Sequence, residues 1–221
     1  MVDIVCYLRA LTGSLKSQFA NRLLYVGLQG SYLRGEATDS SDIDVMVILD
    51  SLGIDDMEIY RNLISSLEYS DRSCGFICGR EDLANWNPLE ICHLLNSTKD
   101  YYGHLADFVP AYSREDVRNF AKLSLNNLYH ELCHRYIHGK MENTENALPA
   151  IYKSSFFILQ NLHYLRTGEF AGTKSQLADK LTGRDRDVLV RAMAYADGAM
   201  FDFSGSYQLL FEWCQESLKR V

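Results

Sequence analysis

Residues 26–49 read VGLQGSYLRGEATDSSDIDVMVIL, and this stretch decides the fold of the N-terminal half. An apolar run ends at Gly30 and Ser31, a polar segment follows, and a second apolar run opens with Asp42 and Asp44. Because alternate side chains of a strand share a face, we expect both aspartates to point the same way. Two neighbouring carboxylates repel each other unless a cation lies between them. Magnesium meets this requirement, since it takes carboxylate oxygens together with nucleotide phosphates.

This spacing resembles the signature of the DNA polymerase β-type nucleotidyltransferase superfamily. Gly30 and Ser31 are followed, after ten intervening residues, by Asp42 and then, after one intervening residue, by Asp44. The fuller string GSYLRGE, with SDID after it, is similar to the small bacterial members, which include the minimal and the aminoglycoside nucleotidyltransferases. About nine positions match in order, so the resemblance concerns the family and leaves the substrate open.

The resemblance implies a transferase that moves a nucleoside monophosphate from a nucleoside triphosphate to a hydroxyl and releases pyrophosphate. ATP is the expected nucleotide. Gly30 and Ser31 are implied to bind its β- and γ-phosphates, and the missing side chain at Gly30 lets backbone N–H groups approach a ligand. Asp42 and Asp44 are the implied catalytic residues, which hold Mg²⁺, with two ions expected.

Arg34 follows the phosphate-binding pair and has two candidate roles. Its guanidinium either contacts a phosphate or holds the loop by pairing with Glu36 or Asp39. An arginine serves both purposes, because its planar fork of donors matches phosphate and carboxylate alike. The two roles therefore stay open.

The third strand departs from the family pattern. Many relatives carry a third carboxylate there, where it binds metal or takes the proton of the acceptor. Residues 73–78 of the strand expected at 71–78 read SCGFIC, without an acid, and Asp71, Glu81 and Asp82 lie at the ends of the strand. Either one of these acids serves, or the base comes from elsewhere, or catalysis is weak.

Size and charge limit the classes to which the protein can belong. The 221 residues suit one large domain or two small ones. The net charge of −7, without a Lys/Arg cluster, argues against a nucleic-acid substrate, which needs many phosphate contacts. No stretch approaches the ~18 apolar residues of a membrane span, and the N-terminus lacks a signal-peptide pattern. We therefore expect a cytoplasmic protein, away from membranes, with reduced cysteines.

Apolar periodicity predicts an α+β domain over residues 1–112. The strand at 42–49 is almost wholly apolar after Asp44, as in a central strand buried on both faces. The other expected elements are helices at 3–20, 55–69 and 89–95 and strands at 22–29, 71–78 and 99–102. The fold class is an N-terminal mixed sheet with flanking helices, followed by a C-terminal all-α bundle.

The bundle is expected over residues 113–221, where every segment reads as helix. Ser113 and Asp116 form a capping-box pattern at the start of the first helix. A second helix is expected at 144–167, with Pro149 near its first turn. An α/β half followed by a helical half is similar to the aminoglycoside nucleotidyltransferases of the kanamycin type.

The kanamycin-type resemblance implies further site residues on the first helix of the bundle. In those enzymes this helix carries a Glu base and, one turn later, a cation for the nucleotide phosphate. Glu131 and Arg135 have this spacing here, so Glu131 is a candidate general base and Arg135 a candidate phosphate contact. An i,i+4 Glu–Arg pair is also a common stabilising pair on a helix surface. Lys153 is a further candidate phosphate contact, or else a solvated lysine.

The same helix reads HELCH at residues 130–134, which fits the zinc-protease pattern His-Glu-x-x-His. Two histidines one turn apart can bind zinc while the Glu activates water. The pattern fixes only three positions, and the third residue after His134 is Ile137 rather than the Gly of the metzincin extension. A zinc protease is therefore a remote alternative.

Three functions of the predicted nucleotidyltransferase stay open. The first is modification of a small hydroxylated compound, an antibiotic for example. The second is transfer of AMP to a protein, as in toxin–antitoxin pairs, although the fused helical half argues mildly against it. The third is nucleotide binding with lapsed catalysis, which the missing acid motivates. A homodimer is also open, because related enzymes often build the site between two subunits.

Overall fold

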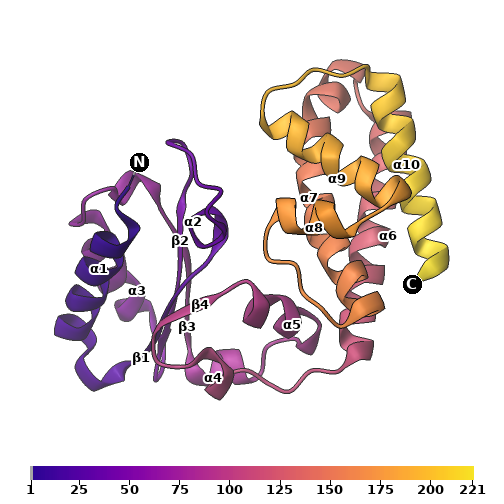
Figure 1. The fold of residues 1–221 in the computed structure, drawn as a ribbon. Coiled ribbons are helices and arrows are strands. Elements are labelled where there is room, and N and C mark those ends of the chain that lie inside the picture. Colours follow the sequence, from indigo (N-terminus) through magenta and orange to yellow (C-terminus); the bar gives the residue numbers. More distant parts are fainter. Residues whose placement is uncertain (1) are drawn as a thin grey trace. The chain divides into compact units, whose positions relative to one another are not determined.

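A computed structural model describes residues 2–221, and the chain forms two compact units, Met1–Tyr112 and Ser113–Val221 (Figure 1). The first unit contains a four-stranded sheet with the strand order β3-β2-β1-β4. Its strands are β1 (Leu23–Leu28), β2 (Ile43–Leu49), β3 (Ser73–Gly79) and β4 (Lys99–Tyr102). Strand β1 is antiparallel to both β2 and β4, whereas β2 and β3 are parallel. The predicted α+β class with a mixed sheet is confirmed.

Two hydrophobic clusters cover the two faces of this sheet. On one face, helices α1 (Ile4–Phe19) and α3 (Ile54–Ser65) pack against Val45 and Val47 of β2. On the other face, Met46 and Ile48 pack with Leu83 of α4 (Arg80–Ala84) and with partly buried residues of α5 (Pro88–Asn96). Every residue of β2 except Asp44 is buried, as predicted for a central strand. Asp44 lies two residues before Met46 and so belongs to the face of the second cluster.

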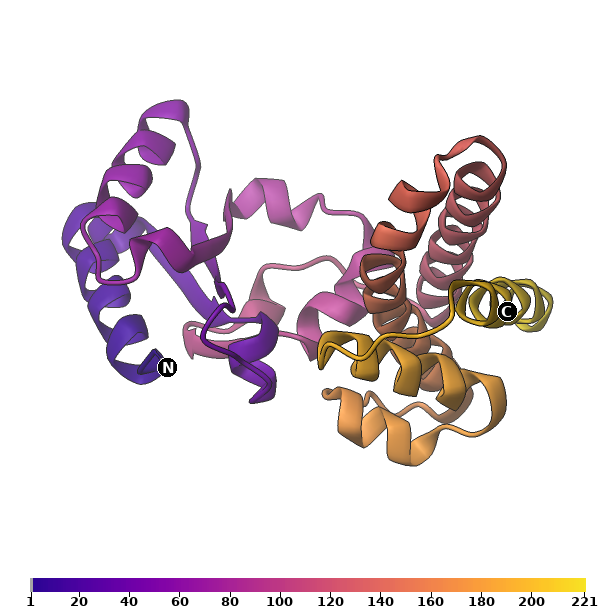
Figure 2. The same cartoon turned by 90° about the horizontal axis from the view of Figure 1, so that it is seen from above.

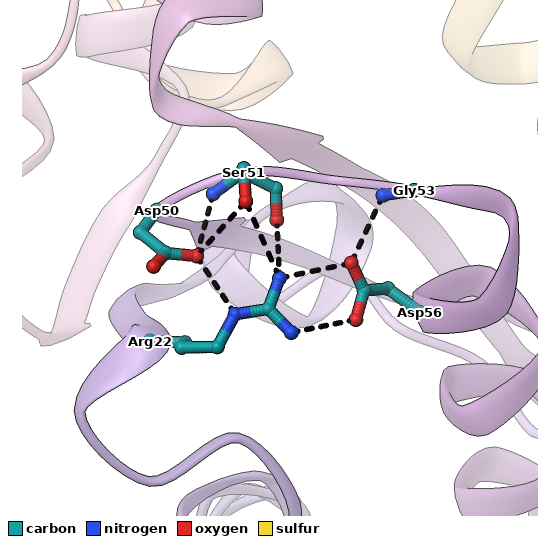
Figure 3. Close-up of polar contacts among 5 residues, drawn as sticks. All are labelled: Arg22, Asp50, Ser51, Gly53 and Asp56. Atoms are coloured by element: carbon teal, nitrogen blue, oxygen red, sulfur yellow. Dashed lines mark hydrogen bonds and ion pairs between the residues drawn. The ribbon is translucent and has the colours of Figure 1, made fainter.

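Arg22 links the C-terminal end of β2, the end away from Asp44, to the start of α3 (Figure 3). Its Nε donates to Asp50 Oδ1 at 3.0 Å, and its Nη2 donates to the Ser51 carbonyl at 3.0 Å. Its Nη1 and Nη2 donate to the two carboxylate oxygens of Asp56, at 2.7 and 2.9 Å. The Gly53 N–H also donates to Asp56 Oδ2, at 2.9 Å. We call these five residues the distal arginine clamp.

The distal arginine clamp makes stability depend on pH at the acid end. The hydrogen bonds from Arg22 and from the Gly53 N–H lower the pKa of Asp56 to about 2. An unfolded aspartate titrates near about 4, so this stabilisation is complete above pH ~4 and is lost as the pH falls toward 2. We expect Arg22→Ala to lower the free energy of unfolding by about 2 kcal/mol at pH 7, and the difference to shrink below pH ~4. Urea unfolding of both proteins across this range is the measurement. A difference that stays constant down to pH 2 would contradict the assignment.

The second unit is helical throughout its regular elements (Figures 1 and 2). Its helices are α6 (Arg114–His138), α7 (Met141–Thr167), α8 (Lys174–Lys180), α9 (Gly183–Ala196) and α10 (Phe203–Arg220). Helix α6 packs against both α7 and α10, and α7 also packs against α9. The predicted capping box is present, because the Ser113 hydroxyl accepts from the Asp116 N–H while the Asp116 carboxylate accepts from the Ser113 N–H.

Helix α7 begins earlier than predicted. It starts at Met141, which places Pro149 inside the helix rather than near its first turn. A proline there donates no backbone hydrogen bond to the preceding turn. Burial of Leu148, Ile151 and Tyr152 on either side of it favours continuation of the helix.

One buried carboxylate links three helices of this unit. Asp185 of α9 is 3% exposed and accepts from Arg166 of α7 at 2.8 Å. It also accepts from Trp213 Nε1 at 2.7 Å and from Arg220 at 2.9 Å, both on α10. Burial by itself raises the pKa of Asp185, but the hydrogen bonds from these three partners outweigh burial and leave the pKa lowered. Asp185 is therefore an ionised centre of the bundle.

Among residues 2–221, no helix has both the length and the apolar content that crossing a membrane requires.

Candidate functional site

The centre of the candidate site is a contact between Gly30 and Asp44. Helix α2 (Gly30–Arg34) starts two residues after β1, and the Gln29 N–H donates to the Asp44 carbonyl at 2.9 Å. Gly30 has a φ of +68°, a conformation that side chains disfavour. A Cβ on Gly30 would lie 1.9 Å from Asp44 Oδ2. The carboxylate of Asp44 therefore occupies the space that any other residue at position 30 would fill.

Asp42 and Asp44 flank the first residue of β2. Asp44 is half-buried against Gly30, whereas Asp42 is exposed just before the strand. Their carboxylates suit Mg²⁺, which prefers one or two protein carboxylates and keeps its other positions for phosphates and water. Magnesium at these two carboxylates stays a proposal.

Ser31 lies in the first turn of α2, beside Gly30. The first N–H groups of a helix have no partner within the helix and carry partial positive charge, which favours an anion. The short helix ends at Gly35, whose φ of +69° is left-handed, and the Glu36 N–H donates to the Ser31 carbonyl at 2.9 Å. This tight turn returns the chain toward β2.

Arg34 pairs with Glu36, one of the two roles left open by the sequence. Its Nε donates to Glu36 Oε2 at 2.9 Å, and both side chains are about one-fifth exposed. The predicted phosphate contact of Arg34 stays a proposal.

Two residues next to the site, Gln29 and His93, were not predicted from the sequence. The Gln29 amide donates to Thr98 Oγ1 at 2.8 Å, and this hydroxyl donates to the Leu94 carbonyl at 2.7 Å. Burial, together with the positive charge of Arg34, lowers the pKa of His93 to about 4, so the imidazole is neutral at pH 7. Gln29 therefore anchors the segment that carries Gly30, and the neutral His93 adds no charge beside Arg34.

Residues 8–72 match the family model of the nucleotidyltransferase domain. This match includes Gly30, Ser31, Asp42 and Asp44. The N-terminal unit contains a nucleotidyltransferase domain. The resemblance and the class of transferase predicted from residues 26–49 are confirmed.

A solved structure resembles the chain through both units. It is the spectinomycin adenyltransferase AAD(9) from Enterococcus faecialis with ATP and spectinomycin, at a TM-score of 0.63 and 16% identity, with 97% of this chain and 99% of that chain covered. At this identity the likeness concerns the fold. A toxin–antitoxin structure with AMP-PNP covers 58% of this chain and 91% of its own at 20% identity, but its TM-score of 0.34 supports no inference. No curated protein matches the sequence.

Strand β3 places an exposed thiol in register with Asp44. The parallel register pairs Asp44 of β2 with Cys74 of β3, and Cys74 is exposed. The next residue, Gly75, has a φ of +132°, and a Cβ on it would lie 2.0 Å from the Val45 carbonyl oxygen. The backbone of β3 is therefore pressed against β2 beside the candidate site.

The three acids at the ends of β3 lie in different places. Asp82 accepts from the Gly79 N–H at 2.9 Å and so caps α4, beyond the end of β3 that lies away from Asp44. Glu81 is exposed on the same helix. Asp71 precedes β3 and, because β2 and β3 are parallel, lies at the same end of the sheet as Asp44. Asp71 is thus the acid of the three nearest in register to the site.

The other predicted site residues belong to the helical unit. Arg135 Nε donates to Glu131 Oε1 at 2.8 Å, and the two side chains are 37% and 42% exposed. The two residues thus form the i,i+4 pair that their spacing allows. Lys153 is exposed on α7. Their catalytic and phosphate-binding roles stay proposals.

An exposed stripe on α6 contains His130 and His134 of HELCH and also His138. The rings of His130 and His134 have centroids 6.0 Å apart, and those of His134 and His138 are 5.2 Å apart. Within residues 2–221, no group of three or more His, Cys, Asp or Glu side chains is arranged to hold a metal ion. A zinc site at HELCH therefore has no third protein ligand in this part of the chain, and the structure adds nothing to the protease alternative.

Proposed function

We propose that the protein transfers AMP from ATP to a hydroxyl of a small molecule and releases pyrophosphate. The observation that carries the proposal is the contact between Gly30 and Asp44, inside a nucleotidyltransferase domain. It joins a Gly-Ser turn, where the missing side chain lets backbone N–H groups approach a phosphate, to a carboxylate, which suits Mg²⁺. A nucleotide triphosphate with its metal satisfies both halves of this arrangement.

Five residues of the domain have a proposed task in this reaction. Gly30 and Ser31 bind the triphosphate tail through backbone N–H groups and the serine hydroxyl, and Arg34 adds a donor. Asp42 and Asp44 would hold Mg²⁺ at the start of β2. When bound, the metal neutralises charge on the attacking and leaving oxygens.

We propose Glu131 as the base that accepts the proton of the acceptor hydroxyl. The supporting observation is that β3 contains no acid and pairs Cys74 with Asp44. Its carboxylate is partly exposed and lies next to Arg135. Arg135 and Lys153 are the proposed further phosphate contacts, and Asp71 is the alternative base.

We propose that the acceptor is a small hydroxylated compound, for example an antibiotic. The net charge of −7 argues against nucleic acid. The likeness to a spectinomycin adenyltransferase extends over the helical unit as well as the sheet. A helical half within the same chain favours a small acceptor over a separate protein.

The proposed function can be tested by a screen for products. The protein is incubated with Mg²⁺, each of the four nucleoside triphosphates and a panel of aminoglycosides, spectinomycin and other polyols. Mass spectrometry detects a nucleotide adduct, and a coupled assay detects pyrophosphate. An adduct on a small molecule supports the proposal. An adduct on protein in a lysate, or ATP binding without any product, replaces it with protein modification or with lapsed catalysis. Light scattering of the same sample shows whether a homodimer forms.

The role of Glu131 predicts a strong and specific loss of rate. We expect Glu131→Gln to lower kcat by on the order of 100-fold, because general base catalysis contributes at least that much. Steady-state kinetics on the acceptor found in the screen gives this value. Glu115→Gln is the matched control, since Glu115 pairs with Arg118 on the same helix, and it should keep wild-type kcat. A wild-type rate in Glu131→Gln would refute the role of Glu131 as the base. Asp71→Asn would then be the next variant to measure.

A further inference from the structure

Arg72 spans two segments of the candidate nucleotide site. It is the last residue of the 3-10 helix Ser70–Arg72, directly before β3, and it is half-buried. Its Nε and Nη2 donate to the Ser41 carbonyl at 3.1 and 2.7 Å, and its Nη2 also donates to the Thr38 carbonyl at 3.3 Å. The same Nη2 donates to the Tyr32 hydroxyl at 2.7 Å. One side chain thus contacts both α2 and the turn that precedes Asp42.

The first of these segments is the turn from Thr38 to Ser41. The Ser41 N–H donates to the Thr38 carbonyl at 3.1 Å, and the Thr38 N–H donates to Ser41 Oγ at 2.9 Å. The carbonyls of both ends of this turn accept from Arg72. The next residue is Asp42, so the position of the turn determines the position of Asp42.

The second segment is α2, through Tyr32. Tyr32 follows Ser31, and the Arg72 guanidinium lies 6.0 Å from the centroid of its ring in addition to bonding its hydroxyl. Arg72 therefore contacts the residue next to the proposed phosphate-binding serine. Its acceptors are two carbonyls and a phenol, which are neutral, so these bonds leave the positive charge of the guanidinium intact.

We propose that Arg72 is a positioning residue of the nucleotide site, which fixes the turn before Asp42 relative to α2. A planar guanidinium can bind several acceptors at once in a fixed geometry, which a lysine ammonium on a flexible stem cannot reproduce. Without it, the exposed Asp42 carboxylate and the phosphate-binding turn would lose their common support. This inference rests on the proposed function, because it assigns both segments to one nucleotide.

The test compares Arg72→Ala and Arg72→Lys with the wild type. Calorimetry measures ATP binding at a series of Mg²⁺ concentrations. We expect both variants to bind ATP with Mg²⁺ at least about tenfold more weakly, because several hydrogen bonds to a charged group are lost. Hydrogen exchange of the metal-free protein should be faster at residues 38–42 in both. Full recovery of affinity and protection by lysine would overturn the inference, since charge alone would then suffice.

Arg22→Ala is the matched control, because Arg22 is also bonded to several acceptors, in the distal arginine clamp. It should reduce stability and leave ATP affinity unchanged. If Arg72→Ala does not fold, Tyr32→Phe removes one acceptor with little change of bulk and should still weaken ATP binding measurably. Wild-type affinity in Tyr32→Phe together with wild-type affinity in Arg72→Lys would refute the inference. A wild-type protein that does not bind ATP with Mg²⁺ would instead refute the proposed function.

Discussion

Replacing Asp44 by Asn is expected to reduce nucleotidyl transfer by at least about 100-fold while the protein stays folded. The substitution keeps the shape of the side chain against Gly30 but removes the negative charge that binds Mg²⁺. Loss of one group that stabilises transition-state charge costs on the order of 10²–10³ in kcat. Pyrophosphate release, measured with the acceptor from the screen, gives the rate. Circular dichroism and thermal unfolding verify the fold.

Asp55→Asn is the control for this loss, because Asp55 is an exposed aspartate in the first turn of α3 in the same unit. It should transfer at the wild-type rate. The double variant Asp42→Asn with Asp44→Asn should be no slower than the slower single variant, since both carboxylates serve the same metal. Full activity in the double variant would refute the proposed mechanism.

Gly30→Ala is expected to damage both stability and nucleotide binding. Two effects add at this position, a φ of +68° and a Cβ that would lie 1.9 Å from Asp44 Oδ2. The first costs about 1–2 kcal/mol and the second, as overpacking, about 1–3 kcal/mol. Because Asp44 or α2 must shift to make room, ATP binding in the presence of Mg²⁺ should weaken as well. Urea unfolding and calorimetry measure the two effects.

Gly35→Ala separates the two effects. Gly35 has nearly the same φ, +69°, but a Cβ on it would meet nothing within 4 Å. It should therefore show the backbone cost alone and retain more of the affinity for ATP. Equal losses of stability and affinity in the two variants would mean that the contact with Asp44 has no role.

Much of the fold follows from local patterns in the sequence. The apolar run of β2 and the helical spacing of α1 predicted elements close to those observed, because burial of both faces of a strand and of one face of a helix produces these patterns. The strand order β3-β2-β1-β4 was not predicted, since pairing depends on contacts between distant segments. Helix α4 was not expected either, because five residues are too few to show a periodic pattern.

The same division applies to the candidate site. Gly30 and Asp44 could be recognised because their spacing within one stretch resembles a known signature. Gln29 and Arg72 could not, because their partners Thr98 and Tyr32 lie 69 and 40 residues away. An amide and a guanidinium carry no local pattern that reveals such partners. The roles that are hardest to read from the sequence are therefore those of side chains that support the site.

The buried Asp185 has a consequence for how the helical unit opens. Arg166 of α7 and Arg220 of α10 share this one carboxylate, so the departure of either helix leaves a buried charge with fewer partners. Opening of a single helix is then costly compared with opening of all three together. Amide protons of α7, α9 and α10 should accordingly exchange with similar free energies, as one cooperative block rather than as a series of fraying helices.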